Sequence, residues 1–162
     1  MSGAAGESTG QTKPATPADA GKLVELMDEF YAEAGYRLDT AHARQAFDVL
    51  LAEPSLGRVW LIRAGSTVVG YVVLTLVYSM EYGGPAAVVE DFFVRAPYRN
   101  AGLGKAAMTV VGTFCARAGI RAVSVQVGRD NPVAQSVYRG AGFATLDRLL
   151  MLLELAEPTH QG

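Results

Sequence analysis

The sequence predicts an α/β fold: a mixed, largely antiparallel sheet flanked by helices, with a central parallel strand–helix–strand unit. Three observations lead to this prediction. Apolar residues recur at helical spacing over residues 16–35 and 40–53, and the period then changes to that of strands over residues 58–94. A glycine-rich run, Arg99-Asn100-Ala101-Gly102-Leu103-Gly104-Lys105, opens a third amphipathic stretch. A strand pattern over residues 120–127 follows that stretch, as a parallel unit requires.

Start and stop signals mark the first two helices. Thr16 followed by Pro17 fits an N-cap with proline at the first helical position, and this helix should end near Gly35. The second helix should begin after Asp39-Thr40 and stop before Pro54. A pair of helices therefore precedes the sheet.

The strands follow from β-rich runs separated by turn residues. Two runs joined by Ala64-Gly65-Ser66 predict an antiparallel hairpin, and a third strand covers Ala86 to Val94. After the third helix, which Gly119 should close, a strand is expected from Ile120 to Val127. A short helix from about Asn131 to Arg139 and a strand-rich, apolar stretch from Gly142 to Leu155 complete the predicted order.

Length and composition indicate one domain. The chain has 162 residues, 50% of them hydrophobic, which we assign to a single domain over residues 14–157. Residues 1–13 are mostly Gly, Ser, Thr and Ala and cannot bury enough apolar surface to fold, so we expect a flexible segment there. Residues 158–162 are expected to form a short tail.

Charge and cysteine content exclude several classes of function. A formal net charge of −2 leaves no excess of Lys or Arg for a nucleic-acid partner. One cysteine and two histidines cannot form an intramolecular disulfide or a zinc site, so we expect no metal and a reducing, cytoplasmic setting. The chain shows no leader and no apolar run of roughly 20 residues, which predicts a soluble protein without a membrane partner.

The glycine-rich run has the character of a pyrophosphate site. A helix N-terminus offers unpaired N–H groups and partial positive charge, and Gly102 and Gly104 would let a pyrophosphate approach the backbone while Arg99 and Lys105 add charge. A P-loop is excluded, because Arg99 stands where its leading glycine should be and Ala106 replaces its Ser or Thr. A dinucleotide fingerprint is matched, but the preceding strands form a meander rather than strand–helix repeats.

Three motifs together are similar to the GNAT superfamily of acetyl-CoA-dependent N-acetyltransferases. They are Arg99-x-x-Gly102-x-Gly104, the preceding Phe93-Val94-x-x-x-Tyr98-Arg99, and Asn131-Pro132-x-Ala134-x-x-x-Tyr138-x-x-x-Gly142-Phe143. The resemblance covers residues 14–155 and implies a GNAT-like fold with a first strand just before Pro14, where the sequence is polar. It also implies acetyl-CoA as acyl donor, bound by Phe92, Phe93, Val94, Arg99, Asn100, Ala101, Gly102, Leu103, Gly104, Lys105, Asn131, Ala134 and Tyr138.

Direct acyl transfer requires a base for the amine and an acid for the departing thiolate. Glu90 lies in an otherwise apolar strand where desolvation should raise its pKa, so we assign it as the base. Its neighbour Asp91 should face the other side of a regular strand unless a bulge brings both carboxylates to one cleft; each could also be paired or solvated. The resemblance places Tyr138 near the cofactor sulfur as the acid, and the alternative is a half-buried packing aromatic.

A cationic amine is the expected acceptor. Glu29 belongs to an acidic band on the first helix, and Glu81 with Tyr82 stands beside a Gly-Gly turn, although these acids could equally be solvated surface. The stretch Glu90 to Val94 also resembles the polyamine (spermidine/spermine) acetyltransferases. The predicted function is therefore acetyl transfer to a small cationic primary amine.

Three further expectations remain open at this point. One alternative function is protein lysine or N-terminal acetylation, and another is a non-catalytic acyl-CoA-binding regulator. A homodimer is also expected, because the apolar run Leu149 to Leu153 could pair with the same strand of a second copy. Burial within one chain would explain that run equally well.

Overall fold

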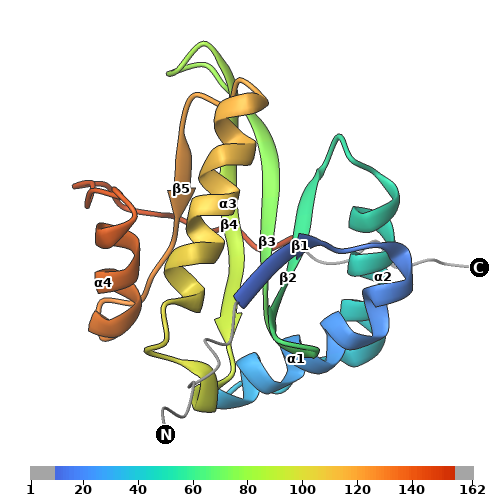
Figure 1. Cartoon of the computed structure of the whole chain (residues 1–162). Coiled ribbons are helices and arrows are strands. Elements are labelled where there is room, and N and C mark those ends of the chain that lie inside the picture. The colour runs from blue at the N-terminus through green and yellow to red at the C-terminus, as the bar shows by residue number, and fades with distance from the viewer. Residues whose placement is uncertain (1–9, 156–162) are drawn as a thin grey trace, which may run out of the picture.

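A computed structural model describes residues 10–155 and shows a five-stranded sheet in the order β1-β2-β3-β4-β5 (Figure 1). Its strands are β1 (Gly10–Pro14), β2 (Gly57–Ala64), β3 (Thr67–Ser79), β4 (Gly84–Val94) and β5 (Val123–Val125). Every neighbouring pair is antiparallel except β4 and β5, which are parallel. The helices are α1 (Ala20–Glu33), α2 (Thr40–Ala52), α3 (Leu103–Arg117) and α4 (Pro132–Gly140), with 3₁₀ turns at Pro17–Asp19 and Ala96–Tyr98. The predicted α/β class is confirmed.

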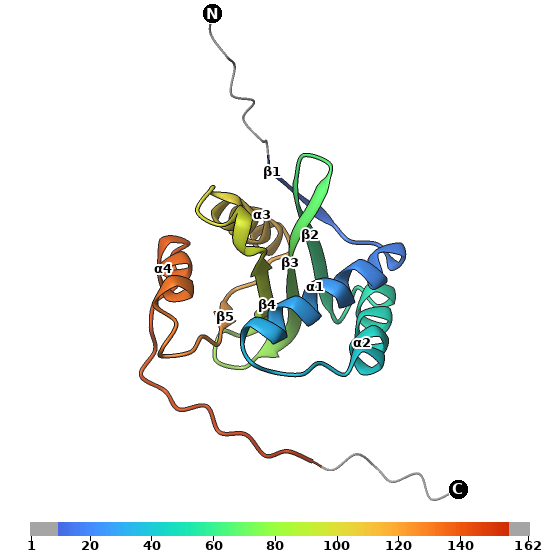
Figure 2. The ribbon, with the colours of Figure 1, turned by 90° about the horizontal axis from the view of Figure 1, so that it is seen from below.

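Helices cover both faces of the sheet (Figure 2). α1 and α2 lie on one face, α3 lies on the other, and α4 stands beside β5. Alternation along β2 explains why both faces are buried: Val59 and Leu61 pack toward α1 and α2, whereas Trp60 and Ile62 pack toward α3. Two apolar clusters therefore sandwich the sheet and fix the helices against it.

The helix boundaries follow local signals in the sequence. The backbone N–H of Thr16 donates to the Asp19 carboxylate (2.8 Å), and the N–H of His42 donates to the Asp39 carboxylate (3.0 Å). Gly35, which follows α1, has a positive φ of 81° that suits glycine. The predicted starts and stops of both helices are confirmed.

A β-bulge interrupts β4 next to its parallel partner. The ladder with β3 pairs Val73 with Asp91 and Leu74 with Val89, so Glu90 is an extra residue without a partner in the register. On the other side, β5 pairs with β4 only from Ala87 to Val89. From the bulge onward, β4 therefore keeps β3 on one side and parts from β5 on the other.

Two predicted strands and one predicted flexible stretch differ from the structure. Residues 10–13, expected to be flexible, belong to β1, because pairing with β2 stabilises a strand that its own side chains do not favour. β5 is shorter than the expected Ile120 to Val127. No strand forms over residues 142–155, because this stretch pairs with no strand of the sheet in the described structure. Residues 1–9 and the expected tail, 158–162, lie outside the described residues.

Two features of residues 10–155 concern membrane segments and metal sites. None of their helices has both the length and the apolar character needed to cross a bilayer. No group of three or more His, Cys, Asp or Glu side chains within this range is placed to hold a metal ion.

Candidate functional site

The bulge brings both carboxylates of β4 to one pocket. Glu90 and Asp91 line a cavity of about 180 Å³ whose remaining wall is largely apolar, formed by Met27, Tyr31, Ala46, Phe47, Leu50 and Val73. In a regular strand, neighbouring side chains would face opposite sides of the sheet. The extra residue therefore produces the arrangement in which the two acids share a cleft.

Asp91 is the more buried of the two carboxylates. Burial raises its pKa, and the negative charge of Glu90 raises it further, while a hydrogen bond from Tyr71 opposes these effects. That hydrogen bond runs from the Tyr71 hydroxyl to Asp91 Oδ2 at 2.9 Å. Tyr71 itself is fully buried, packed edge-on against the rings of Phe47 and Phe93. A fixed donor therefore orients a half-buried carboxylate of raised pKa.

Glu90 lies in a different environment from the one expected. The prediction of a desolvated Glu90 is wrong, because the bulged residue projects from the ladder and is exposed to solvent. Its Oε1 accepts a hydrogen bond of 2.8 Å from the Thr75 hydroxyl. Asp91 is half-buried and its pKa is raised, which are features that suit a base.

Tyr138 lies in α4 on the α3 side of the sheet. Its ring is 8% exposed and packs against Phe92 and Phe143, with centroid distances of 6.0 and 5.4 Å. Burial, with a smaller effect of the Asp91 charge, raises the pKa of Tyr138 to about 12. The phenol therefore keeps its proton at neutral pH and is both a packing residue and a candidate proton donor.

The glycine-rich run forms a tight loop that leads into α3. Asn100 and Gly102 have positive φ angles of 62° and 81°, and Ala106 N–H donates to Gly102 O as the helix begins. The N–H groups of residues 103–105 consequently have no acceptor in a preceding helical turn. A Cβ on Gly104 would lie 3.0 Å from Phe92 Cζ, so glycine allows the first turn of α3 to pack closely against the Phe92 side chain of β4.

Other predicted cofactor residues surround this loop. Arg99 donates to Val94 O (2.7 Å) and to the Glu33 carboxylate (2.6 Å), and its guanidinium lies 5.6 Å from the Phe93 ring centroid. The Asn131 side chain accepts from Ala134 N–H (3.1 Å) and thereby caps α4. The loop follows the C-terminal end of β4, and α4 lies on the far side of β5 from β4 (Figure 1).

The predicted substrate residues are not among those that line the carboxylate pocket. Glu29 binds the Arg95 guanidinium through hydrogen bonds of 2.6 and 2.8 Å, which tie α1 to the end of β4. Glu81 forms a bidentate pair with Arg148, and Tyr82 lies exposed in the β3–β4 turn. These acids are engaged by arginines, and their role toward a substrate stays a prediction.

The sequence did not reveal the residues that complete the pocket. Tyr71 has the sequence pattern of an apolar strand position, and Tyr31 has that of a helix core position. Neither pattern distinguishes these residues from ordinary core residues. The signal for Tyr71 lies in the register: it faces the same side as Val73, which pairs with Asp91. That signal exists only once the β3–β4 pairing is known.

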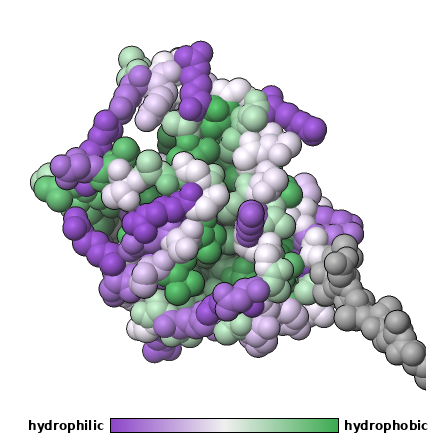
Figure 3. Space-filling model, turned by 60° about the vertical axis from the view of Figure 1, so that its left-hand side comes forward, coloured by the Kyte–Doolittle hydropathy of each residue, from purple (hydrophilic) through white to green (hydrophobic). Residues whose placement is uncertain are grey.

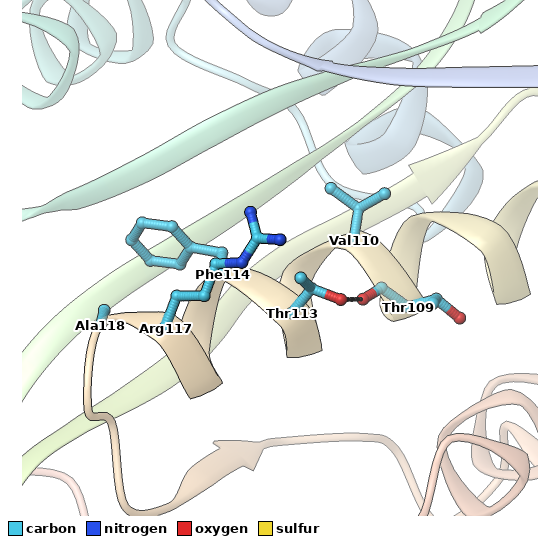
Figure 4. A pocket seen from close by; sticks show the side chains of 6 residues that line it. All are labelled: Thr109, Val110, Thr113, Phe114, Arg117 and Ala118. Carbon is cyan, nitrogen blue, oxygen red and sulfur yellow. Dashed lines mark hydrogen bonds between the residues drawn. The ribbon is translucent and has the colours of Figure 1, made fainter.

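A larger hollow lies along α3, and it lacks the chemistry of the carboxylate pocket (Figure 4). It measures about 490 Å³ and is lined by Thr109, Val110, Thr113, Phe114, Arg117 and Ala118. Thr113 donates to the backbone oxygen of Thr109 (3.0 Å), so that hydroxyl is satisfied within the helix. No carboxylate lines this hollow, which leaves the smaller pocket as the candidate active site.

The chain is similar to known proteins both in its sequence family and in its structure. The model of the acetyltransferase (GNAT) family matches residues 22–143. Integron cassette protein HFX_CASS3, from the mobile metagenome of Cole Harbour Salt Marsh, is 46% identical over 93% of this chain and 94% of its own, with a TM-score of 0.83. No curated protein matches the chain.

Two more distant structures share the fold. One is the aminoglycoside acetyltransferase meta-AAC0020 from an uncultured soil metagenomic sample, solved with sisomicin; it is 18% identical over 91% of this chain and 97% of its own, with a TM-score of 0.73. The other is the ribosomal-protein-alanine N-acetyltransferase of Brucella melitensis biovar Abortus 2308. It is 18% identical over 91% of this chain and 100% of its own, with a TM-score of 0.71.

Proposed function

Because the chain belongs to the GNAT family of acetyltransferases, we propose that it transfers an acetyl group from acetyl-CoA to a small cationic primary amine. The observation that carries this proposal is the pocket at the bulge, where Glu90 and Asp91 meet in one cleft. Two adjacent carboxylates attract an ammonium group and can then accept its proton.

The size and lining of the pocket favour a small acceptor. Its volume of about 180 Å³ is below the roughly 300–1,000 Å³ typical of sites for drug-sized ligands. The walls from α1 and α2 are apolar, so they suit a short alkyl chain behind the amine. A small alkylamine fits such a cleft, and one aminomethyl arm of an aminoglycoside is a second acceptor of the same chemistry.

The loop and the open edge of β4 would hold the acyl donor. The free N–H groups at residues 103–105 and the cations Arg99 and Lys105 suit a pyrophosphate, and Gly104 keeps a side chain out of that cradle. The unpaired edge of Phe92 to Val94 is available for backbone hydrogen bonds to an extended pantetheine arm. Acetyl-CoA, when bound, supplies the acetyl thioester.

The chain's own residues would move two protons. Asp91, oriented by Tyr71, accepts a proton from the bound ammonium so that the amine becomes nucleophilic. Tyr138 would then donate its hydroxyl proton to the departing sulfur. Because its pKa is about 12, Tyr138 still carries this proton at neutral pH. Glu90 remains a negative neighbour that raises the basicity of Asp91.

Thiol release measured with separate acceptor panels tests this proposal. The purified chain, with acetyl-CoA, should release CoA thiol with small alkyl amines or aminoglycosides, and mass spectrometry should show the acetylated amine. Faster turnover of lysine peptides or protein N-termini would replace the proposal with protein acetylation. Tight binding of acetyl-CoA without turnover of any acceptor would instead indicate a non-catalytic acyl-CoA-binding regulator.

The donor loop can be tested separately from the chemistry. We expect Gly104→Val to raise the Kd for CoA by about tenfold or more, equivalent to about 1.4 kcal/mol, because the branched side chain meets Phe92 and covers the free N–H groups. Isothermal titration calorimetry measures this change. Gly112→Ala in the same helix is the control: a Cβ there meets open space, so the free energy of unfolding should rise by about 0.5–1 kcal/mol with CoA affinity unchanged. An unaltered Kd in Gly104→Val would contradict the assignment of the loop.

A further inference from the structure

The carboxylate pocket has a polar wall and an apolar wall. Its two acids, Glu90 and Asp91, both belong to β4. Tyr31 of α1 lies near them: burial raises the pKa of its hydroxyl, and the charges of Asp91 and Glu90 raise that pKa further. The other lining residues are apolar, namely Met27 from α1, Ala46, Phe47 and Leu50 from α2, and Val73 from β3. The acids are therefore gathered at one wall of the cavity.

The packing of the two helices gives this pocket a direction. α1 packs against β3 and β4, whereas α2 packs against β2. Figure 2 shows the same order, with α2 on the side of α1 that is away from β4. The pocket consequently runs from the carboxylates on β4, past Val73 on β3, to the apolar side chains of α2.

The place of the acyl donor decides which end of the acceptor enters which end of the pocket. The reacting amine has to lie at β4, because this strand carries both Asp91 and the open edge from Phe92 to Val94 where the donor would bind. The rest of the acceptor then extends away from β4, between α1 and α2. There it meets the apolar side chains of Ala46, Phe47 and Leu50.

The α2 end of the pocket offers no acid to a second ammonium group. Among residues 10–155, no carboxylate other than the two β4 acids lines the pocket. The acids expected to attract cations are engaged elsewhere, since Glu29 pairs with Arg95 and Glu81 pairs with Arg148. Figure 3 shows the side of the molecule that carries α4 and the β5 edge, where hydrophilic side chains surround the apolar ones. The lining contributed by α2 is apolar throughout.

We infer that the acceptor is a primary monoamine with an apolar tail, and that the site selects against acceptors whose tail carries a second ammonium. This inference rests on the proposed function, and of the two acceptors considered there it selects the alkylamine over the aminoglycoside. The ammonium group binds at Glu90 and Asp91, while the tail is removed from water among the α2 side chains. A terminal ammonium would enter the same apolar surroundings without a carboxylate partner, which is strongly unfavourable.

Three amines of equal length test this inference in steady-state thiol-release assays with acetyl-CoA. Pentylamine ends in a methyl group, 4-aminobutan-1-ol in a hydroxyl, and 1,4-diaminobutane in a second ammonium. We expect kcat/KM for pentylamine to exceed that for the diamine by about 10²-fold or more, with the amino alcohol between them. Equal or faster turnover of the diamine would overturn the inference and leave the proposed acetyl transfer standing. Turnover of no amine in this set or among the aminoglycosides would overturn the proposed function as well.

The length of the tail provides a second measurement. From ethylamine to pentylamine, kcat/KM should rise by about fourfold with each added methylene, because each one buries further apolar surface in the pocket. A value of kcat/KM that does not change along this series would show that the tail stays in water. That result would overturn the inference even if all four amines are acetylated.

A new carboxylate at the α2 end should reverse the preference. Ala46 is an exposed residue of α2 at the pocket wall, so a longer side chain is tolerated there. Ala46→Glu should raise kcat/KM for 1,4-diaminobutane by about tenfold or more and lower that for pentylamine, because the new acid pairs with the second ammonium. Ala46→Gln, of the same shape without the charge, is the matched control and should not raise diamine turnover. An unchanged preference in Ala46→Glu, or an equal gain in Ala46→Gln, would overturn the inference.

Discussion

Replacing Asp91 with Asn should lower kcat/KM by about 10²- to 10⁴-fold, the range expected for loss of a general base. The amide keeps the shape of the side chain and can still accept the hydrogen bond from Tyr71. What the variant loses is the capacity to take a proton from the acceptor amine. Steady-state kinetics with the best amine from the panel measures the loss, and CoA affinity should be unchanged.

The stability of this variant provides its internal control. The pKa of Asp91 is raised in the folded state, so the carboxyl favours folding below its unfolded pKa, and that contribution is lost as pH rises through the folded pKa. At neutral pH the charged carboxylate of Asp91 therefore lowers the free energy of unfolding. Asp91→Asn should be at least as stable as the wild type at neutral pH, and the difference should vanish in acid. A destabilised variant would mean that lost activity reflects lost structure.

Glu90→Gln is the matched comparison, because it removes the neighbouring charge and keeps the bulge. The charge of Glu90 raises the pKa of Asp91, so its removal should lower that pKa and move the acid limb of the kcat/KM profile to lower pH. The loss of activity should be smaller than in Asp91→Asn. The reverse order, a large loss in Glu90→Gln with a mild effect in Asp91→Asn, would return the role of base to Glu90.

Tyr138→Phe should lower kcat by about 10²-fold or more, because the departing thiolate loses its proton donor. The ring contacts with Phe92 and Phe143 need no hydroxyl, so the melting temperature and the Kd for CoA should stay close to those of the wild type. Because the pKa of Tyr138 is about 12, deprotonation of this residue should not lower the activity of the wild type as pH rises until close to that pH. Tyr36→Phe, at a site that is 70% exposed, is the control. An unchanged kcat in Tyr138→Phe would exclude Tyr138 as the proton donor and would show that its role is packing.

The sequence predicted those parts of the fold that local signals determine. Caps at Thr16 and Asp39 and the glycine at position 35 act within one helical turn, so they are legible without knowledge of the tertiary structure. The loop before α3 was equally legible, because its glycines and the helix behind it are neighbours in the chain. Its role in binding acetyl-CoA is still a prediction.

The features that sequence reasoning missed depend on pairing between distant segments. The burial of Asp91 and the exposure of Glu90 depend on which residue of β4 has no partner in β3. The sequence of β4 alone does not indicate which residue this is. For the same reason Tyr71 was not recognised as the partner of Asp91. The polar strand β1 and the absent strand beyond Gly142 show the same dependence: β1 is a strand because it pairs with β2, whereas the apolar stretch beyond Gly142 pairs with no strand in the described structure.

The bulge at Glu90 also bears on how such a site can be lost during evolution. Removing that single residue would leave Val73 opposite Asp91 and Leu74 opposite Val89 as neighbouring pairs of an unbroken ladder. β5 could then continue along β4 past Val89, sealing the edge that the donor would need. A deletion of one codon would thus close the sheet while sparing every other residue of the site. The spacing between Val89 and Asp91 is therefore as necessary to this pocket as the two carboxylates that line it.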